Sequence, residues 1–111
     1  MNERIEKAIK AYRLALKYRE KVLKKWELRG DELRSLDEFH RTRVAWENDM
    51  WRSEELEKAT ARTVLGAIKG EPGWMPTFNV SYFEKCRNRD FLKVWNLLKE
   101  MIDEEVFCTI P

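Results

Sequence analysis

The 111-residue sequence has no glutamine, only three serines, two cysteines and a single histidine, His40. One histidine excludes histidine-ligated zinc sites and di-iron bundles, because these sites need a second histidine or several cysteines at fixed spacing. We therefore expect no metal site and no bound cofactor, and the sequence offers no recognisable set of catalytic residues.

Long apolar runs are also absent. The longest uncharged stretch lies between Glu71 and Glu84 and contains the helix breakers Pro72, Gly73 and Pro76. The first thirty residues hold fourteen charged side chains, so we expect neither a signal peptide nor a membrane-spanning helix. Two cysteines without a secretory signal indicate reduced thiols, and the sequence therefore predicts a cytoplasmic location.

Charged residues make up 38% of the chain and nearly balance, at a net charge of +2. Abundant lysine and glutamate without glutamine is typical of hyperthermophile proteins, and this composition indicates a thermophilic source. The charge is unevenly distributed. Residues 1–30 carry ten Lys/Arg and four Glu, whereas residues 31–111 carry twelve Lys/Arg and sixteen Asp/Glu. A basic first segment therefore precedes a mildly acidic remainder.

The chain reads as one helical domain over 1–111, and its first predicted helix spans 2–29. Apolar residues recur there at spacings of three and four, and only Arg19 interrupts them. Gly30 is expected to end this helix in the left-handed conformation. The predicted buried stripe consists of Ile5, Ala8, Ile9, Tyr12, Ala15, Leu16, Val22, Leu23 and Trp26.

A second helix is predicted over 36–69, because Ser35 and Glu38 have the spacing of a capping box. Its seam has heptad-like spacing, with polar residues in the middle. Ser53 could start a new helix, so a break near 52–53 stays open, although the absence of glycine and proline between Leu36 and Val64 favours continuity. The apolar members of this seam are Leu36, Phe39, Trp46, Met50, Val64 and Ala67.

Residues 70–80 are expected to form a loop, because they contain Gly70, Pro72, Gly73 and Pro76. Ser81 and Glu84 form another capping box and open a third predicted helix over 81–106. If this helix is continuous, Cys86 and Cys108 lie about 33 Å apart, too far for a disulfide.

The sequence thus predicts an all-α fold with three long helices in an antiparallel bundle. A short connection makes the first two helices neighbours, in which facing positions should sum to about 65. Trp26 should then meet Phe39, Ile5 should meet Thr60, and Arg19 should lie beside Trp46 and Glu47.

The leading functional hypothesis is a small non-enzymatic interaction protein that self-associates into a homo-oligomer or binds a protein partner, in a regulatory or inhibitory role. Its candidate contact residues are Trp74, Met75 and Phe78, which are large apolar side chains in a loop. Such residues either cover the end of the core or stand exposed as binding anchors, and the sequence leaves both open.

A second hypothesis is a nucleic-acid-binding accessory protein that uses a basic stripe. The stripe occupies an arc of about 80° on the first predicted helix and extends for about 21 Å, so it could follow a phosphate backbone. Cationic arcs of this kind also serve as solvated faces. The basic stripe consists of Lys10, Arg13, Lys17, Lys21 and Lys24.

A third hypothesis comes from Arg34 and His40, whose spacing resembles the arginine and histidine motif of HEPN-type ribonucleases. In that family such residues meet across a dimer interface to cleave a phosphodiester. The resemblance covers two residues only, and Arg34 precedes the predicted cap at Ser35 instead of lying inside a helix.

Overall fold

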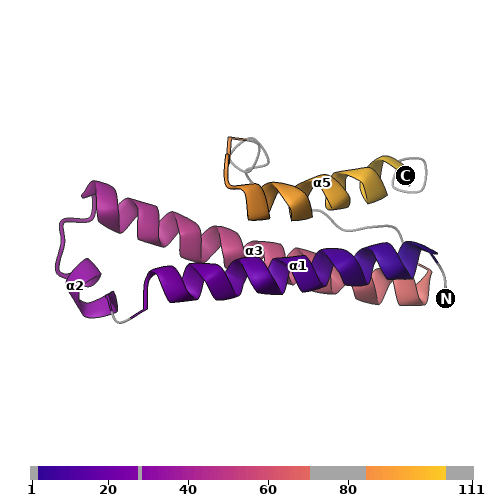
Figure 1. The fold of residues 1–111 in the computed structure, drawn as a ribbon, viewed down its shortest axis with the longest axis horizontal. Coiled ribbons are helices and arrows are strands. Elements are labelled where there is room, and N and C mark those ends of the chain that lie inside the picture. The colour runs from indigo at the N-terminus through magenta and orange to yellow at the C-terminus, as the bar shows by residue number, and fades with distance from the viewer. Residues whose placement is uncertain (1–2, 28, 71–84, 105–111) are drawn as a thin grey trace.

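The computed structural model describes residues 3–27, 29–70 and 85–104, the last three by their backbone only. The helices within these residues are α1 (Glu3–Lys25), α2 (Gly30–Arg34), α3 (Arg41–Lys69) and α5 (Arg89–Glu104). Helices α1 and α3 run antiparallel along the long axis of the molecule, and α5 lies along one side of this pair (Figure 1). The predicted all-α bundle with three long helices is confirmed.

Helix α1 is central because it packs against both α3 and α5. Its Tyr18 ring meets Phe91 of α5 edge-on at 5.8 Å, and Phe91 stacks on Trp95 at 6.0 Å. Such aromatic pairs stabilise the α1–α5 contact beyond the area that they bury. The buried side chains of α1 are Ala8, Ala11, Ala15, Tyr18 and Val22, and Trp26 is buried directly after the helix.

Small side chains dominate the face that α3 buries. Ser53, Thr60 and Thr63 are buried polar residues of this face, and their hydroxyls donate to carbonyls of their own helix at 2.8 to 3.0 Å. Each of these hydroxyl protons therefore has an acceptor within α3. The small residues bring the backbones of α1 and α3 close together, and these two helices form the scaffold of the fold.

The connection between α1 and α3 differs from the prediction. Gly30 begins α2 and has no left-handed conformation, whereas Gly70 at the end of α3 has a φ of 77°. Ser35 donates to the Glu32 carbonyl at 2.6 Å instead of capping the next helix. His40 caps α3, because its Nδ1 accepts from the Thr42 amide at 3.1 Å. Residues 36–40 consequently lie outside α3.

Helix α3 is continuous, so the break considered near 52–53 does not occur. Helix α5 begins later than predicted, at Arg89, because the Asn88 side chain accepts from the amides of Asp90 and Phe91 at 2.9 and 3.1 Å. Residues 85–88 are not helical. The predicted capping box at Ser81 and Glu84 lies outside the described residues.

The predicted register of α1 against α3 is wrong. Arg19 donates to Ser53 Oγ at 2.9 Å and pairs with Glu57 at 3.3 Å, and Trp26 donates to Asp49 at 3.0 Å. The numbers of these pairs sum to between 72 and 76 instead of 65, because α2 and residues 35–40 lengthen the connection.

Two predicted contacts fail with this register. Phe39 is 82% exposed and does not meet Trp26. Ile5 packs with Ala8, Ala67 and Met101 at the other end of the helix pair. Arg19 does obtain an ion-pair partner as expected, although from Glu57 and not from Glu47.

Candidate interaction surface

Helix α1 buries only half of its apolar stripe. The buried half carries mostly alanines, whereas Leu16 and Leu23 remain 38% and 46% exposed. The alanines face the inside because α1 is enclosed by two helices, which approach most closely where side chains are small. Large aliphatic side chains that the sequence places in the core therefore lie at the surface.

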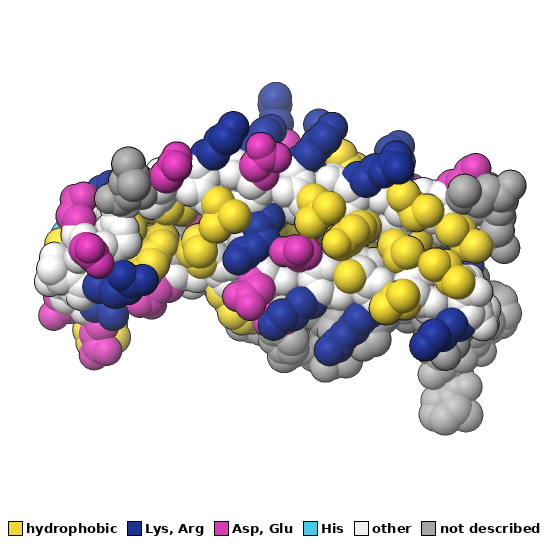
Figure 2. Space-filling model, turned by 90° about the horizontal axis from the view of Figure 1, so that it is seen from below, with side chains coloured by type: hydrophobic (Ala, Val, Ile, Leu, Met, Phe, Trp, Pro, Cys, Tyr) yellow, Lys and Arg dark blue, Asp and Glu magenta, His cyan; other side chains and the backbone are white. Residues whose placement is uncertain are grey.

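Helix α3 exposes apolar side chains on the same side of the molecule. Leu65 and Ile68 are 56% and 61% exposed, and Val64 and Ala61 are partly exposed. Seen from the side opposite α5, hydrophobic side chains form a band along the helix pair (Figure 2). We define the apolar face as Ile5, Ile9, Tyr12 and Leu16 of α1 with Ala61, Val64, Leu65 and Ile68 of α3.

Helix geometry puts these residues together. At 100° per residue, the four α1 members fall within about 60° and the four α3 members within about 100° of arc. The register of Ala8 near Ala67 sets the two groups at the same height along the pair. On α1 the group extends for about 17 Å, which is three helical turns.

A polar contact limits the apolar face on one side. Arg19 of α1 and Glu57 of α3 form an ion pair at 3.3 Å, with side chains that are partly exposed. Arg19 also donates to the Met50 carbonyl at 3.3 Å. With the Ser53 hydroxyl, the guanidinium thus has three partners, which offset the cost of its partial burial. Beyond it lie Leu23 and the partly buried Trp46 and Met50.

Cationic residues surround the apolar face. Residues 7–19 and 58–69, the stretches of α1 and α3 that carry most of it, contain no aspartate or glutamate. Dark blue side chains accordingly lie above and below the larger group of hydrophobic ones in Figure 2. The Lys/Arg residues of the two stretches are Lys7, Lys10, Arg13, Lys17, Arg19, Lys58, Arg62 and Lys69.

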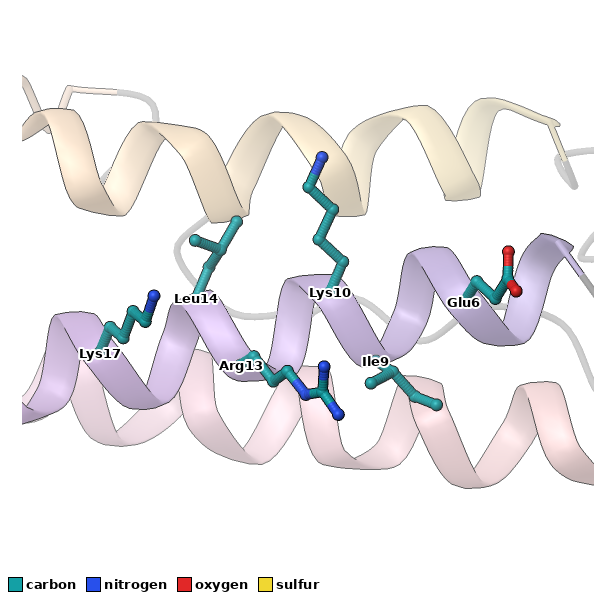
Figure 3. Close-up of a pocket in the computed structure, with 6 residues that line it drawn as sticks. All are labelled: Glu6, Ile9, Lys10, Arg13, Leu14 and Lys17. Carbon is teal, nitrogen blue, oxygen red and sulfur yellow. The ribbon is translucent and has the colours of Figure 1, made fainter.

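All members of the basic stripe are exposed, but their surroundings differ. Lys21 pairs with Asp90 of α5 at 3.0 Å, and Lys24 lies 3.8 Å from Glu20. Lys10, Arg13 and Lys17 form no ion pair with any residue that the structure describes. These three line an open hollow of about 440 Å³ on α1, together with Glu6, Ile9 and Leu14 (Figure 3).

Figure 3 shows that this hollow is shared between two sides of α1. Lys10 and Leu14 point toward α5, whereas Ile9 and Arg13 point to the opposite side. Lys10 and Leu14 also line a second hollow with Lys93 and Leu97 of α5. The basic stripe therefore diverges at its N-terminal end, and Arg13 belongs to the border of the apolar face.

The two residues of the ribonuclease hypothesis are exposed and have local partners. Arg34 ends α2, pairs with Asp31 at 3.3 Å and lies over the Trp46 ring. His40 is the cap of α3, and its Nδ1 is engaged by the Thr42 amide.

The loop candidates Trp74, Met75 and Phe78 lie outside the described residues, as does Cys108. Cys86 is buried. Within the described part of the chain, no three His, Cys, Asp or Glu side chains are placed to hold a metal ion. No helix in that part is both long and apolar enough to cross a membrane.

A polar cluster joins α1 and α3 at the other end of the core. Asp49 accepts from Trp26 at 3.0 Å and from Lys25 at 3.1 Å, and lies 3.5 Å from Arg52. Burial raises the pKa of the adjacent Tyr18 to about 12, although the Arg52 guanidinium acts in the opposite direction. These charges are paired with one another, so the cluster is explained by its role in holding the helices together.

Sequence reasoning missed the apolar face, because all of its α1 members and Val64 were expected in the core. The signal was present in the width of the apolar arc, which covers about half of α1 and exceeds what one helix contact buries.

Comparison of the chain with protein-family models, curated proteins and solved structures finds no match.

Proposed function

We propose that this protein is a small helical interaction protein that binds a protein partner through the apolar face. The observation that carries the proposal is the exposure of Leu16, Leu65 and Ile68 on one side of the α1–α3 pair. Contiguous exposed apolar surface is typical of protein interaction sites. A small protein that binds a partner and covers part of its surface can regulate or inhibit that partner.

Site-specific photo-crosslinking in cells tests this function. A benzoylphenylalanine at Leu65 should yield a discrete protein adduct, and the same residue at Lys99 of α5 is the control, because Lys99 is exposed on a different helix. Adding Leu16→Gln and Ile68→Gln should remove the adduct, since these changes delete apolar contact area without adding charge. An unchanged adduct in this variant would refute the proposal.

Stability measurements separate loss of binding from loss of folding. Leu16 is 38% and Ile68 is 61% exposed, so each substitution should lower the free energy of unfolding by no more than about 1 kcal/mol. Circular dichroism melting of the full chain with Leu16→Gln and Ile68→Gln should therefore resemble that of the unmodified protein.

A second candidate function is nucleic-acid binding by the basic stripe. The specific observation in its favour is that Lys10, Arg13 and Lys17 have no ion-pair partner among the described residues. Unpaired cations spaced along one helix side can neutralise consecutive phosphates. The pairing of Lys21 with Asp90 and of Lys24 with Glu20 counts against it, because it reduces the charge available.

A further inference from the structure

The border of the apolar face is predominantly basic. On α1, Arg13 and Lys17 follow directly after Ile9 around the helix, and on α3 Lys58 and Lys69 follow after Leu65. Arg13 and Lys17 form no ion pair with a described residue. Glu6 lies near the N-terminal end of the face, between Arg13 and Lys17 around α1, and lines the same hollow. The next acidic residues, Glu20 on α1 and Glu57 on α3, lie beyond the ends of the face.

This charge distribution selects among possible occupants. A second copy of the chain seated on the same face would bring Lys and Arg borders against each other, and opposed like charges across an interface are unfavourable. A partner with carboxylates along its edges would instead form ion pairs on both sides of the apolar contact. Charge complementarity therefore favours an acidic partner over self-association.

The shape of the face indicates a helix. Two antiparallel helices already carry α5 on one side, and a further helix packed on the opposite side would complete a four-helix arrangement. An amphipathic helix that docks in this way presents apolar side chains at positions i, i+3, i+4 and i+7. The 17 Å length of the face on α1 accommodates about three turns of such a helix.

We propose that the apolar face binds an amphipathic helix of a partner protein whose flanks carry aspartate or glutamate. This inference rests on the proposed function and adds the chemistry of the partner. The apolar residues provide the contact area, and the basic border determines which helices are accepted.

Two synthetic peptides test the charge selection on the full-length protein. Both are eighteen-residue amphipathic helices with the same leucine face, one flanked by glutamate and the other by lysine, and binding is measured by fluorescence anisotropy. The glutamate peptide should bind at least tenfold more tightly than the lysine peptide. Its affinity should fall between about 50 mM and 500 mM salt, because exposed charges are screened.

Charge reversal supplies the sharper test. Arg13→Glu with Lys69→Glu should weaken the glutamate peptide at least tenfold and strengthen the lysine peptide. Lys85→Glu with Lys99→Glu changes the net charge equally but lies away from the apolar face, and it should alter either affinity by less than twofold. Leu65→Gln with Ile68→Gln should weaken the glutamate peptide at least tenfold without lowering the melting temperature appreciably.

Three outcomes would overturn the inference. In the first, the glutamate peptide fails to bind, or the protein still prefers it to the lysine peptide after the charges of Arg13 and Lys69 are reversed. In the second, the protein binds vesicles of phosphatidylserine and phosphatidylcholine through Leu65 and Ile68, which would make a lipid surface the occupant. In the third, light scattering shows a dimer that Leu65→Gln with Ile68→Gln dissociates. A dimer would refute the acidic partner helix but would still agree with protein binding through the apolar face. A photo-crosslink that persists after Leu16→Gln and Ile68→Gln would instead refute the proposed function itself.

Discussion

At the scale of single residues, Arg19 shows how a charge is accommodated in an apolar stripe. Its guanidinium pairs with Glu57 and donates to Ser53 and to a backbone carbonyl, so each bond offsets part of the lost hydration. The sequence predicted that Arg19 needs a partner but named the wrong one, because partner identity depends on the register of the helices. The need for an ion pair could be predicted from Arg19 itself. Its partner could not, because the length of the connection between α1 and α3 determines which residue of α3 lies opposite.

Tyr18 leads to a prediction about alkaline unfolding. Its side chain is fully buried, and burial raises its pKa to about 12 from an ordinary value near 10. The folded state therefore keeps the phenol proton where the unfolded chain has lost it, and stability falls as pH rises from 10 through 12. Its contribution to this loss should reach about 2 to 3 kcal/mol in the wild-type protein.

Tyr18→Phe isolates that contribution. The variant should show a smaller decrease in unfolding free energy between pH 10 and pH 12 when urea denaturation is followed by circular dichroism. Lysine deprotonation affects both proteins in the same range, so the difference between them reports on Tyr18. Tyr12→Phe, at a partly exposed position, is the matched control and should behave like the wild type. Parallel pH curves for all three proteins would contradict the assigned effect of burial.

At the scale of helices, the sequence predicted type and order better than boundaries. Apolar spacing correctly indicated α1 and a continuous α3, because long amphipathic periodicity is a strong signal. The capping box at Ser35 was misleading, because its local pattern also suits the end of α2, where Ser35 donates to Glu32. His40 acts as the cap in its place, a role that its residue type does not suggest.

The close contact between α1 and α3 depends on small residues. Ala15 of α1 is fully buried, and Ala61 of α3 is partly exposed on the apolar face. Ala15→Leu adds three carbon atoms to a packed core and should destabilise the protein by about 1 to 3 kcal/mol. Ala61→Leu is the matched change at the surface and should have little effect on stability.

Thermal and urea unfolding followed by circular dichroism compare the two variants. A lower melting temperature for Ala15→Leu alone would agree with close α1–α3 packing at this position. Equal destabilisation by both substitutions would instead mean that Ala61 is enclosed as tightly as Ala15.

At the scale of the whole molecule, the apolar face could be predicted only in part. Leu16, Leu65 and Ile68 are ordinary core residues by type, and a sequence does not tell which half of a wide stripe another helix covers. That choice depends on α5, which packs against the alanine side of α1 through Phe91 and Trp95. The lack of acidic residues in 7–19 and 58–69 is visible in the sequence, but its meaning depends on the register that brings these stretches together.

Some cations of the basic stripe have ion-pair partners and others have none in the described part of the chain. This difference gives the nucleic-acid hypothesis a quantitative test. Affinity for duplex DNA should decrease with the logarithm of salt concentration at a slope of about −0.9 for each phosphate neutralised. If contacts to phosphates come only from Lys10, Arg13 and Lys17, which have no ion-pair partner in the described part of the chain, the slope should be about −2.7. A slope near −4.5 would mean that Lys21 and Lys24 leave Asp90 and Glu20 to bind DNA.

Substitutions then assign the slope to residues and separate DNA from a protein partner. Lys10→Glu with Lys17→Glu should flatten the slope by about two and weaken all DNA sequences alike, because phosphate contacts carry no base information. Lys85→Glu with Lys99→Glu changes net charge equally and controls for general electrostatic attraction. Leu65→Gln with Ile68→Gln should leave DNA affinity unchanged, since apolar side chains neutralise no phosphate, although it should weaken binding of the acidic helix at least tenfold. Absence of DNA binding by the wild-type protein at about 50 mM salt, where weakly screened cations attract phosphates strongly, would remove the nucleic-acid hypothesis and leave the basic residues as the border of the apolar face.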